Sequence, residues 1–212
     1  MNAKLPTKAQ VYQYLWTATL LTAFFSAVYG YTNWRADQVQ RHFQFYYDWE
    51  LSIPLIPWMI LPYVSLNLLT IAPLFYFSPP ELRRMGRTMA VAIVIAGAIF
   101  YMFPAPIGFL RPDSVPGIWD YLFKLVWTFD RTNNTLPSLH ITFSGIAILA
   151  LWAKLTWKEK IVYTLWTVMI CLAVLFTWQH HVWDIITGLI LSVICHKVVS
   201  KVPEGEGFSW EV

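Results

Sequence analysis

Two histidines and an aspartate lie close together in the stretch Thr-Trp-Gln-His-His-Val-Trp-Asp, residues 177–184. His180 and Asp184 are four residues apart, so in a helix their side chains lie on one face. A carboxylate that orients a histidine makes it a better nucleophile, and an aspartate beside an apolar segment favours a functional role. The structural alternative is a helix-capping aspartate beside two interfacial histidines. His181 is a second candidate nucleophile, but the spacing favours His180.

Two more polar groups precede this stretch. Pro137-Ser138-Leu139-His140 opens one apolar segment, and Arg111-Pro112 lies in the loop before it. His140 can protonate a leaving oxygen and later activate water, and Arg111 can bind phosphate oxygens through its planar fork. Helix N-termini at Ser138 and near His181 would offer free backbone N–H groups to an anion. Together these residues predict phosphoryl transfer that uses the arginine and the helix ends in place of a metal ion or another cofactor.

His140 and Arg111 each have a structural alternative. A histidine at the start of a span can lie at the membrane interface without touching a substrate. An arginine near the end of a span commonly extends toward the lipid headgroups. The chemistry predicted for both residues therefore depends on their meeting His180 and Asp184 in the fold.

The composition is that of a membrane protein. Hydrophobic residues make up 57% of the 212 residues and charged residues only 13%, whereas a soluble domain has about 25% charged residues. We expect residues 1–212 to form one membrane-embedded domain with a flexible tail at about 203–212, in contact with the bilayer and with no nucleic acid. The two cysteines both lie in apolar segments, so they predict neither a disulfide framework nor a cysteine-rich metal site.

Six segments are apolar enough for a membrane span, which needs roughly 20 mainly apolar residues. We expect an all-α integral membrane fold, a six-transmembrane-helix bundle with interfacial helices in the outer loops. These interfacial helices are expected within Asn33–Ile53, where charged and aromatic residues mix, and at Trp119–Phe129. The first span could instead be a cleaved signal peptide, but no clean small-residue cleavage site follows it. The spans are predicted at about residues 11–31, 54–77, 88–109, 138–157, 161–178 and 182–200.

The lysines and arginines predict the orientation, because cytoplasmic loops carry more of them. With the N-terminus inside, ten of the 15 Lys and Arg residues face the cytoplasm and five face outward. Both termini are then cytoplasmic, and Arg111, His140 and His180 lie together at the outer face. We expect the protein in a bacterial inner membrane with its site facing outward.

The ordered motifs resemble the type 2 phosphatidic acid phosphatase superfamily of membrane lipid-phosphate phosphatases and phosphotransferases. Its general pattern is Lys-x6-Arg-Pro, then Pro-Ser-Gly-His, then Ser-Arg-x5-His-x3-Asp. Arg111-Pro112 matches the end of the first motif, Pro137, Ser138 and His140 match the second, and His180 and Asp184 match the third. The resemblance implies a six-helix bundle in which His180 forms a phosphohistidine that Asp184 orients. It also implies that His140 is the general acid and base, and that Arg111 and Ser138 hold the phosphate, with Pro137 beside them.

The sequence departs from this pattern at several motif positions. Pro104 stands at the lysine position, and Ala173 and Val174 stand at the Ser-Arg positions, so two phosphate-binding cations are missing. Arg131 and Lys124, in the same outer loop as Arg111, are candidates to replace them. His181 is expected to contact the substrate or to lie at the interface. The missing cations suggest a hypothesis, that the group bound is a phosphodiester with one charge and not a monoester with up to two.

One branch of the superfamily is more similar to this sequence than the general pattern. Leu139 in place of the motif glycine, and the segment Asp48-Trp49-Glu50-Leu51-Ser52-Ile53-Pro54, resemble the branch that holds inositol phosphorylceramide synthase. Members of that branch transfer a phosphoalcohol head group between lipids. Asp48 and Glu50 themselves are expected to be interfacial polar residues, with the alternative that they orient Arg111 or bind an acceptor.

These observations predict a membrane enzyme that hydrolyses or transfers a phosphate ester of a lipid. Water as the acceptor makes it a lipid phosphatase, and a lipid or polyol hydroxyl makes it a phosphotransferase. Phosphatidate, a polyprenyl phosphate or diphosphate, a phosphorylated glycolipid and a sphingolipid all fit as substrates.

Two readings from other classes stay open. One is a membrane haem protein with His140 and His180 or His181 as axial ligands, which a Soret band and bound iron would identify. The other is a transporter that uses the His/Asp cluster as a proton relay. A flux abolished by His180→Ala, without loss of lipid-phosphate turnover, would identify the transporter.

Overall fold

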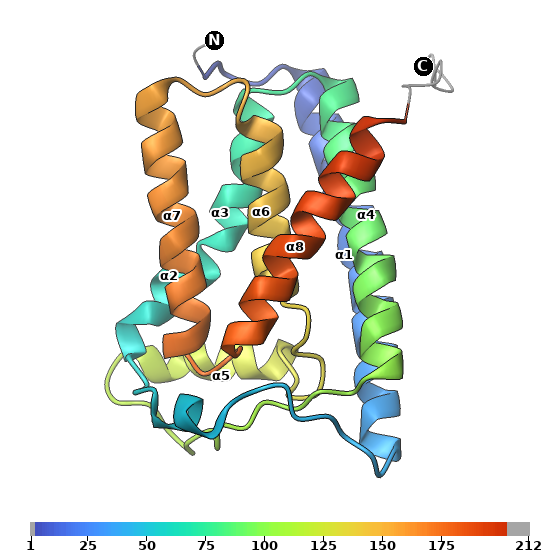
Figure 1. Ribbon diagram of the computed structural model, residues 1–212. Coiled ribbons are helices and arrows are strands. Elements are labelled where there is room, and N and C mark those ends of the chain that lie inside the picture. The colour runs from blue at the N-terminus through green and yellow to red at the C-terminus, as the bar shows by residue number, and fades with distance from the viewer. Residues whose placement is uncertain (1–2, 203–212) are drawn as a thin grey trace.

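Capping residues fix the starts of three long helices (Figure 1). In the computed structural model, which describes residues 3–202, α1 (Lys8–Gln38) begins after Thr7, α4 (Pro79–Met102) after Ser78 and α7 (Trp157–Phe176) after Thr156. The third residue of each helix is a Gln or Glu whose side chain accepts the cap's backbone N–H at 2.8 Å. This arrangement satisfies a donor at the entrance to the helix. The stretch Ser78-Pro79-Pro80-Glu81 thus forms the capped start of α4.

The remaining helices are shorter or interrupted. A broken rod spans Pro57–Phe75, with 3-10 turns at both ends that each carry a proline in the first turn. Proline lacks a backbone N–H and fits best at a helix start, so each of these prolines favours a new start over a continuous helix. The other bounds are η1 (Asp48–Ser52), η2 (Pro57–Met59), α2 (Ile60–Val64), α3 (Leu66–Ile71), η3 (Ala72–Phe75), α5 (Trp119–Phe129), α6 (Leu139–Leu151) and α8 (Val182–Ser200).

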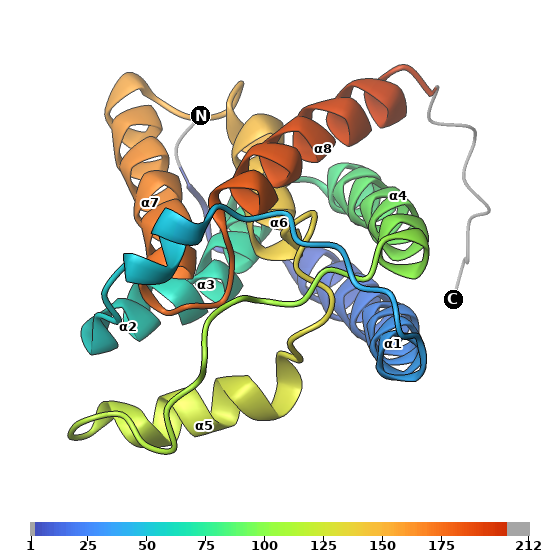
Figure 2. The same ribbon diagram turned by 60° about the horizontal axis from the view of Figure 1, so that its bottom comes forward.

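Helix α6 lies inside the bundle, where it contacts α3, α4, α7 and α8, while α1 packs along α4. The start of α1 and the end of α8 lie at the same end of the molecule, at the top of Figure 1. Helix α5 lies crosswise at the opposite end (Figures 1 and 2). The starts of α6 and α8 point toward this α5 end, so the residues that open these two helices are brought to it.

Four helical segments within residues 3–202 are long and apolar enough to cross a membrane: Pro57–Phe75, α4, α7 and α8. They correspond to four of the six predicted spans. Large hydrophobic side chains cover their outer faces; Leu165 on α7 and Ile190 on α8, for example, are 60% and 52% exposed. Apolar surface of this extent suits lipid and not water, so the chain is an integral membrane protein.

The other two predicted spans form helices α1 and α6, and neither is among the four candidates. α1 has 31 residues, but four threonines and one serine interrupt its apolar sequence. α6 has 13 residues, or about 20 Å at 1.5 Å per residue, which is less than the roughly 30 Å of a hydrocarbon core. The six-span topology therefore stays a prediction.

The prediction of an interfacial helix within Asn33–Ile53 is wrong. α1 continues to Gln38, and most of the segment that follows is extended, with only the short 3-10 turn η1 near its end. The Phe43 N–H donates to the carbonyl of Pro104 at 2.9 Å, and the Tyr46 ring stacks on His181. These long-range contacts use the extended backbone, so they override the amphipathic pattern.

Other predicted elements can be compared with the fold directly. The helix expected at Trp119–Phe129 is confirmed as α5. The third span, expected at residues 88–109, begins earlier, at Pro79, because Ser78 and Glu81 cap the helix there, and it ends at Met102. The tail predicted at residues 203–212 lies outside the described residues.

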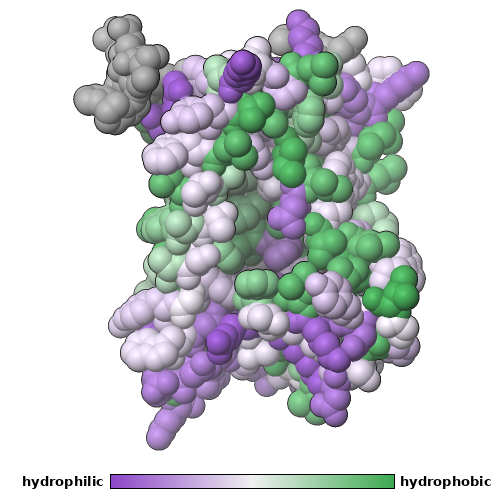
Figure 3. Space-filling view, turned by 180° about the vertical axis from the view of Figure 1, so that it is seen from behind, coloured by the Kyte–Doolittle hydropathy of each residue, from purple (hydrophilic) through white to green (hydrophobic). Residues whose placement is uncertain are grey.

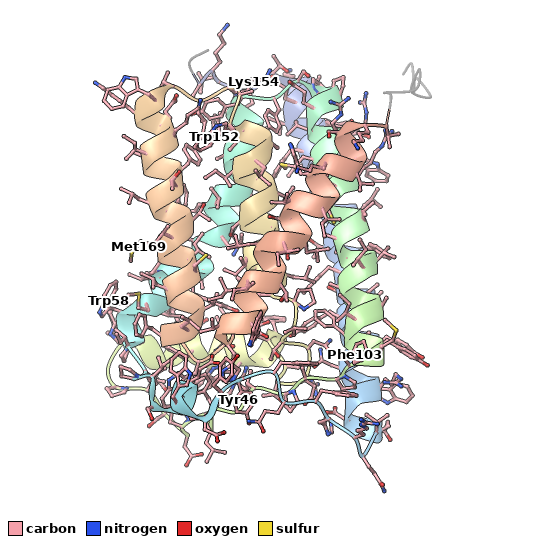
Figure 4. All side chains as sticks on the ribbon, in the orientation of Figure 1. Tyr46, Trp58, Phe103, Trp152, Lys154 and Met169 are labelled. Carbon is pink, nitrogen blue, oxygen red and sulfur yellow. The ribbon has the colours of Figure 1, made fainter. Side chains whose placement is uncertain are left out.

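Side chains of different polarity are segregated along the long axis of the bundle. Seen from behind, hydrophilic side chains gather at the α5 end and hydrophobic ones cover much of the middle (Figure 3). The middle of this face is hollowed, and hydrophilic surface lies within the hollow. Tyr46 lies near the α5 end, whereas Trp152 and Lys154 lie at the opposite end (Figure 4). Aromatic residues at both ends are typical of a protein that contacts two membrane interfaces.

Gly188 allows α8 to approach the start of α6. A Cβ at this position would lie 2.7 Å from the backbone oxygen of Ser138, which cannot turn aside as a side chain can. We expect Gly188→Ala to destabilise the protein by about 1–3 kcal/mol, measured from thermal unfolding in detergent. Gly30→Ala is the matched control, because a Cβ there meets nothing within 4 Å and alanine favours a helix. Equal stabilities of the two variants would contradict the close approach.

Candidate active site

The starts of α6 and α8 meet at one point. The Ser138 N–H donates to the backbone oxygen of Asp184 at 3.0 Å, and the Thr142 hydroxyl donates to the carbonyl of Gly188 at 3.2 Å. The loop after α4 reaches the same place, because Arg111 Nη2 donates to Gln179 Oε1 at 3.1 Å. The three polar groups singled out in the sequence are therefore brought together at the α5 end of the bundle.

Asp184 holds His180 in a fixed orientation. His180 Nδ1 lies 3.2 Å from Asp184 Oδ2, and the same oxygen accepts the backbone N–H of His181 at 2.8 Å. The aspartate therefore caps the first turn of α8 and also contacts His180. The helix cap and the pairing with histidine, considered as alternatives from the sequence, are both present. His180 and Asp184 are 7% and 1% exposed. Because Nδ1 faces the carboxylate, Nε2 is the nitrogen left for chemistry, and no described residue hydrogen-bonds to it.

His140 faces His180 from the first turn of α6. The two ring centroids are 6.3 Å apart, a separation at which both rings can contact a small group between them. Tyr63 of α2 stacks on the His140 ring at 4.3 Å and donates its hydroxyl to Asp130. Asp130 also accepts the Tyr29 hydroxyl at 3.4 Å. This packing acts on the face of the His140 ring and leaves its nitrogens for a substrate.

Arg111 lies half-buried in the loop between α4 and α5. Besides its bond to Gln179, its guanidinium carbon lies 5.6 Å from the centroid of the Trp127 ring. Burial lowers the pKa of Arg111 from its ordinary value, and the charge of Asp130 opposes that shift. A snorkelling arginine would extend its head group to the water. Here the guanidinium is instead held against the residue that precedes His180.

His181 is buried, with an exposed fraction of 1%, and contacts protein through both ring nitrogens. Its Nε2 accepts the N–H of Gly108 at 3.1 Å, and its Nδ1 lies 3.2 Å from Glu50 Oε2. Tyr46 and Phe109 both stack on its ring, at 4.3 and 4.8 Å. Burial lowers the pKa of His181, against the neighbouring carboxylates, which suits a neutral ring that accepts at Nε2. The ring therefore does not lie at the membrane interface, and the predicted contact of His181 with substrate stays a prediction.

Glu50 was expected at the interface but is fully buried. Its Oε2 accepts the N–H of Val182 at 2.8 Å as well as facing His181, and its Oε1 accepts the N–H of Tyr47 at 2.9 Å. A carboxylate at the start of a helix is favourable because the first-turn N–H groups are free and the dipole is positive there. Glu50 therefore fixes the first turn of α8, and with it the backbone beside His180.

We expect Glu50→Ala to be strongly destabilising. It leaves the Val182 N–H and the His181 Nδ1–H buried without an acceptor, and each unpaired group costs about 1–3 kcal/mol. The expected loss of stability is roughly 2–5 kcal/mol, measured from thermal unfolding in detergent. Asp48→Ala is the control, because Asp48 is exposed and its contact with Gln44 is a long one of 3.4 Å. A Glu50 variant as stable as the Asp48 variant would disprove the positioning role.

Ser138 and Pro137 shape the start of α6. Both are buried, and Ser138 Oγ accepts the N–H of Ile141 at 3.4 Å, which is the behaviour of a helix N-cap. No hydrogen bond joins the N–H groups of Leu139 and His140 to another described residue. A helix start with free N–H groups attracts an anion. Ser138 therefore contributes to the site in two ways. It caps α6 and so sets the direction of the free N–H groups, and it lies at the point where α6 meets α8.

Arg131 and Lys124 do not reach the cluster. Lys124 is exposed on α5 and pairs with Asp120 at 2.6 Å. Arg131 is exposed, and its contact in the structure is a backbone one, in which its carbonyl accepts the Tyr29 hydroxyl at 3.3 Å. Within the described residues, neither side chain hydrogen-bonds to the catalytic candidates, so the prediction that one of them replaces a missing cation finds no contact to support it.

The motif positions without a cation are filled by apolar packing. Pro104 is buried, and Ala173 and Val174 are fully buried in α7. The carbonyl of Val174 accepts the N–H groups of Gln179 and His180 at 3.0 and 3.1 Å. Val174 thus supports the turn that presents His180 through its backbone and offers no side-chain donor to a phosphate.

Several contacts between polar residues of the site could not be predicted from the sequence. Gln179 was visible as the neighbour of His180, but nothing indicated that it accepts from Arg111. Tyr63 and Asp130 are 67 residues apart, and their contact leaves no signal in a single sequence. Within residues 3–202, no group of three or more His, Cys, Asp or Glu side chains is placed to hold a metal ion.

Comparison with known protein families matches residues 85–207, more than half of the chain, to the family described as the PAP2 superfamily. The matched range contains Arg111, His140, His180 and Asp184, and it leaves out Glu50 and the rest of the N-terminal part. No curated protein and no solved structure matches the chain.

Proposed function

Because the chain belongs to the PAP2 superfamily, we propose that it is a membrane enzyme that hydrolyses or transfers a phosphate ester of a lipid through a phosphohistidine. The observation that carries the proposal is the 3.2 Å contact between His180 Nδ1 and Asp184 Oδ2, which directs Nε2 away from the carboxylate. A histidine oriented in this way is an activated nucleophile. His140, whose ring centroid lies 6.3 Å from that of His180, is the partner that handles protons.

The reaction has two steps. In the first, His180 Nε2 attacks phosphorus while the bond from phosphorus to the ester oxygen breaks, and the departing oxygen takes a proton from His140. Asp184 stabilises the positive charge that forms on the His180 ring. In the second step, His140 takes the proton of an acceptor hydroxyl, whose oxygen attacks phosphorus and releases His180. Water as the acceptor gives hydrolysis, and an alcohol gives transfer.

Arg111 and the start of α6 stabilise the charge on the phosphate oxygens. The guanidinium can donate in the plane of two oxygens, and its bond to Gln179 keeps it beside His180. The N–H groups of Leu139 and His140 add donors whose direction is fixed before the substrate arrives.

We infer that the site faces outward from a six-helix membrane bundle with cytoplasmic termini. The start of α1 and the end of α8 share one end of the bundle, and the lysines and arginines near them favour the cytoplasm for that end (Figure 1). Asp113, an exposed loop residue between α4 and α5, offers a test. A membrane-impermeant thiol reagent should label the Asp113→Cys variant in intact cells; labelling only after lysis would reverse the orientation.

A second candidate is a head-group phosphotransferase that acts on a phosphodiester lipid, as the likeness to the inositol phosphorylceramide synthase branch implies. The burial of Pro104, Ala173 and Val174 favours it. Arg111 is then the one cation that the three motifs still supply, and a single cation matches a single negative charge better than two.

The test is a panel of lipid phosphomonoesters, diphosphates and phosphodiesters offered to the purified full-length protein, with His180→Ala as the blank. Inorganic phosphate and transferred head group are both measured. Phosphate release from a monoester identifies a phosphatase, and a transferred head group identifies the second candidate. A protein that turns over no member of the panel faster than the blank would refute both.

A further inference from the structure

Two buried hydrogen-bond donors near the catalytic histidines have no partner among the described residues. They are Nε of Arg111 and Nε1 of Trp127. Folded proteins pair nearly all of their buried donors, so each unpaired group requires an explanation such as a bound ligand or water. Both side chains lie in the same part of the molecule, and each lacks a hydrogen-bond acceptor.

The two donors are held close together. The Arg111 guanidinium carbon lies 5.6 Å from the centroid of the Trp127 ring, and Phe123, on the same face of α5, packs edge-on against that ring at 5.3 Å. Arg111 Nη2 is already used by Gln179, which precedes the nucleophile, so the guanidinium is fixed on one side and free at Nε. The two unpaired N–H groups therefore belong to side chains that contact each other, and an acceptor group with two oxygens is the kind of group that would pair both.

The charges around these donors specify the acceptor. Arg111 is a cation, whereas the indole N–H is neutral. Asp130, whose carboxylate accepts from Tyr63 and Tyr29, is near enough to affect Arg111 and adds negative charge on the same side. The two motif positions that would add cations hold Pro104 and Val174. A phosphate bound here thus meets the single cation Arg111, whose charge Asp130 partly offsets, together with neutral donors.

We propose that the N–H groups of Trp127 Nε1 and Arg111 Nε bind the two non-bridging oxygens of the substrate phosphate and make the site selective for phosphodiesters. The inference rests on the proposed function and names its substrate class. A diester carries one negative charge on these two oxygens, which the guanidinium neutralises while the indole donates to the second oxygen. A monoester dianion brings a third unesterified oxygen and a second charge, and no second cation lies in the cluster within residues 3–202.

The reaction of a diester at this site balances in the same two steps. The bond from His180 Nε2 to phosphorus forms as one ester bond breaks, and the leaving alcohol oxygen takes a proton from His140. The other ester bond stays, so His180 carries a phosphoalcohol group. An acceptor hydroxyl then gives its proton to His140, bonds to phosphorus and releases His180.

The experiment follows the indole signal of Trp127 by NMR in the full-length His180→Ala protein, labelled with ¹⁵N at tryptophan and held in detergent. The signal is identified by its loss in the Trp127→Phe variant. Dihexanoyl phosphatidylglycerol serves as the diester probe and dihexanoyl phosphatidate as the monoester probe, at a pH where the monoester is a dianion. We expect the Trp127 signal to shift with the diester and much less with the monoester.

Affinities measured by the same titrations give the second readout. Trp127→Phe keeps the aromatic ring but removes the N–H, and we expect it to weaken binding of the diester about 10- to 100-fold. Trp166→Phe is the control, because Trp166 Nε1 already donates to Ser65 Oγ at 2.7 Å, and we expect its affinity to stay within about twofold.

Three results would overturn the inference. The first is a Trp127 signal that shifts with neither probe, which is the result expected if only ordered water pairs the donors. The second is a tighter complex with the monoester than with the diester, and the third is an unchanged diester affinity in Trp127→Phe. The second, which compares the affinities of the two probes, needs no folded variant at position 127. The proposed function fails separately, if the unsubstituted protein captures no phosphate on His180 while the Trp127 signal still responds to the diester.

Discussion

Replacing His180 by alanine is expected to reduce turnover of the phosphate ester by roughly 10⁴- to 10⁶-fold. The variant loses the only ring whose Nδ1 contacts Asp184 and whose Nε2 is left without a partner among the described residues. The variant should also capture no phosphate. The measurement is a rapid quench with radiolabelled substrate, followed by separation under alkaline conditions, because the bond of a phosphohistidine survives base and is lost in acid.

Two other histidines provide the controls for this result. His42 is exposed, with Nε2 3.0 Å from the carbonyl of Ala36, and His42→Ala should keep its turnover within about twofold. His181→Ala should lose stability, since it vacates a ring stacked between aromatic residues, but the fraction that stays folded should still be labelled. Label that persists in His180→Ala and disappears in His181→Ala would make His181 the nucleophile.

The pair His180 and Asp184 could be predicted from the sequence, but the two side chains do not share a helical face. α8 begins only at Val182, and Asp184, in its first turn, reaches back to His180, which precedes the helix. The sequence also predicted that Arg111 and His140 would join them, since the basic residues fixed which ends of the spans share a side. The contact with Gln179 and the stacking of Tyr63 on His140 then follow from tertiary packing. Neither contact has a sequence period or a spacing from which it could have been predicted.

Glu50 shows most clearly where sequence reasoning ends. An acidic residue among exposed aromatic residues is ordinarily interfacial, and composition favoured that interpretation. In the fold, the segment before η1 is extended and places Glu50 against the start of α8, where the Val182 N–H and the His181 ring pair with Oε2, while the nearby Tyr47 N–H pairs with Oε1. Burial of a carboxylate is favourable only with such partners, and the two partners of Oε2 lie more than 130 residues away in the chain.

Helix lengths were predicted less well than helix positions. Apolar runs located the four candidate spans, but the helix ends depend on caps such as Ser78 and Thr156, and on where the chain must leave the helix to reach the site. α6 is the clearest case, since it begins at Leu139, beside the predicted start, but ends at Leu151, well before the predicted end at residue 157.

Replacing His140 by glutamine is expected to slow turnover of an alkyl phosphate ester by roughly 10²- to 10⁴-fold. The alkoxide that leaves needs the proton that His140 supplies. A p-nitrophenyl ester of the same phosphate should lose far less in its first step, because its leaving oxygen is stable without a proton. The rate of the first step with each ester, measured as the pre-steady-state burst of released alcohol or p-nitrophenol and compared with the unsubstituted protein, measures the difference.

The second step separates a catalytic His140 from a structural one. Without a base to activate the acceptor, the phosphohistidine formed rapidly from the p-nitrophenyl ester should accumulate in His140→Gln, and the label on the protein should rise above that of the unsubstituted enzyme. Tyr63→Phe is the matched control, because it keeps the ring that stacks on His140 and removes only the hydroxyl that donates to Asp130. We expect that variant to accumulate no label. Equal losses with both esters and no accumulated label in His140→Gln would assign His140 a packing role, since only a proton donor makes the rate depend on the leaving group.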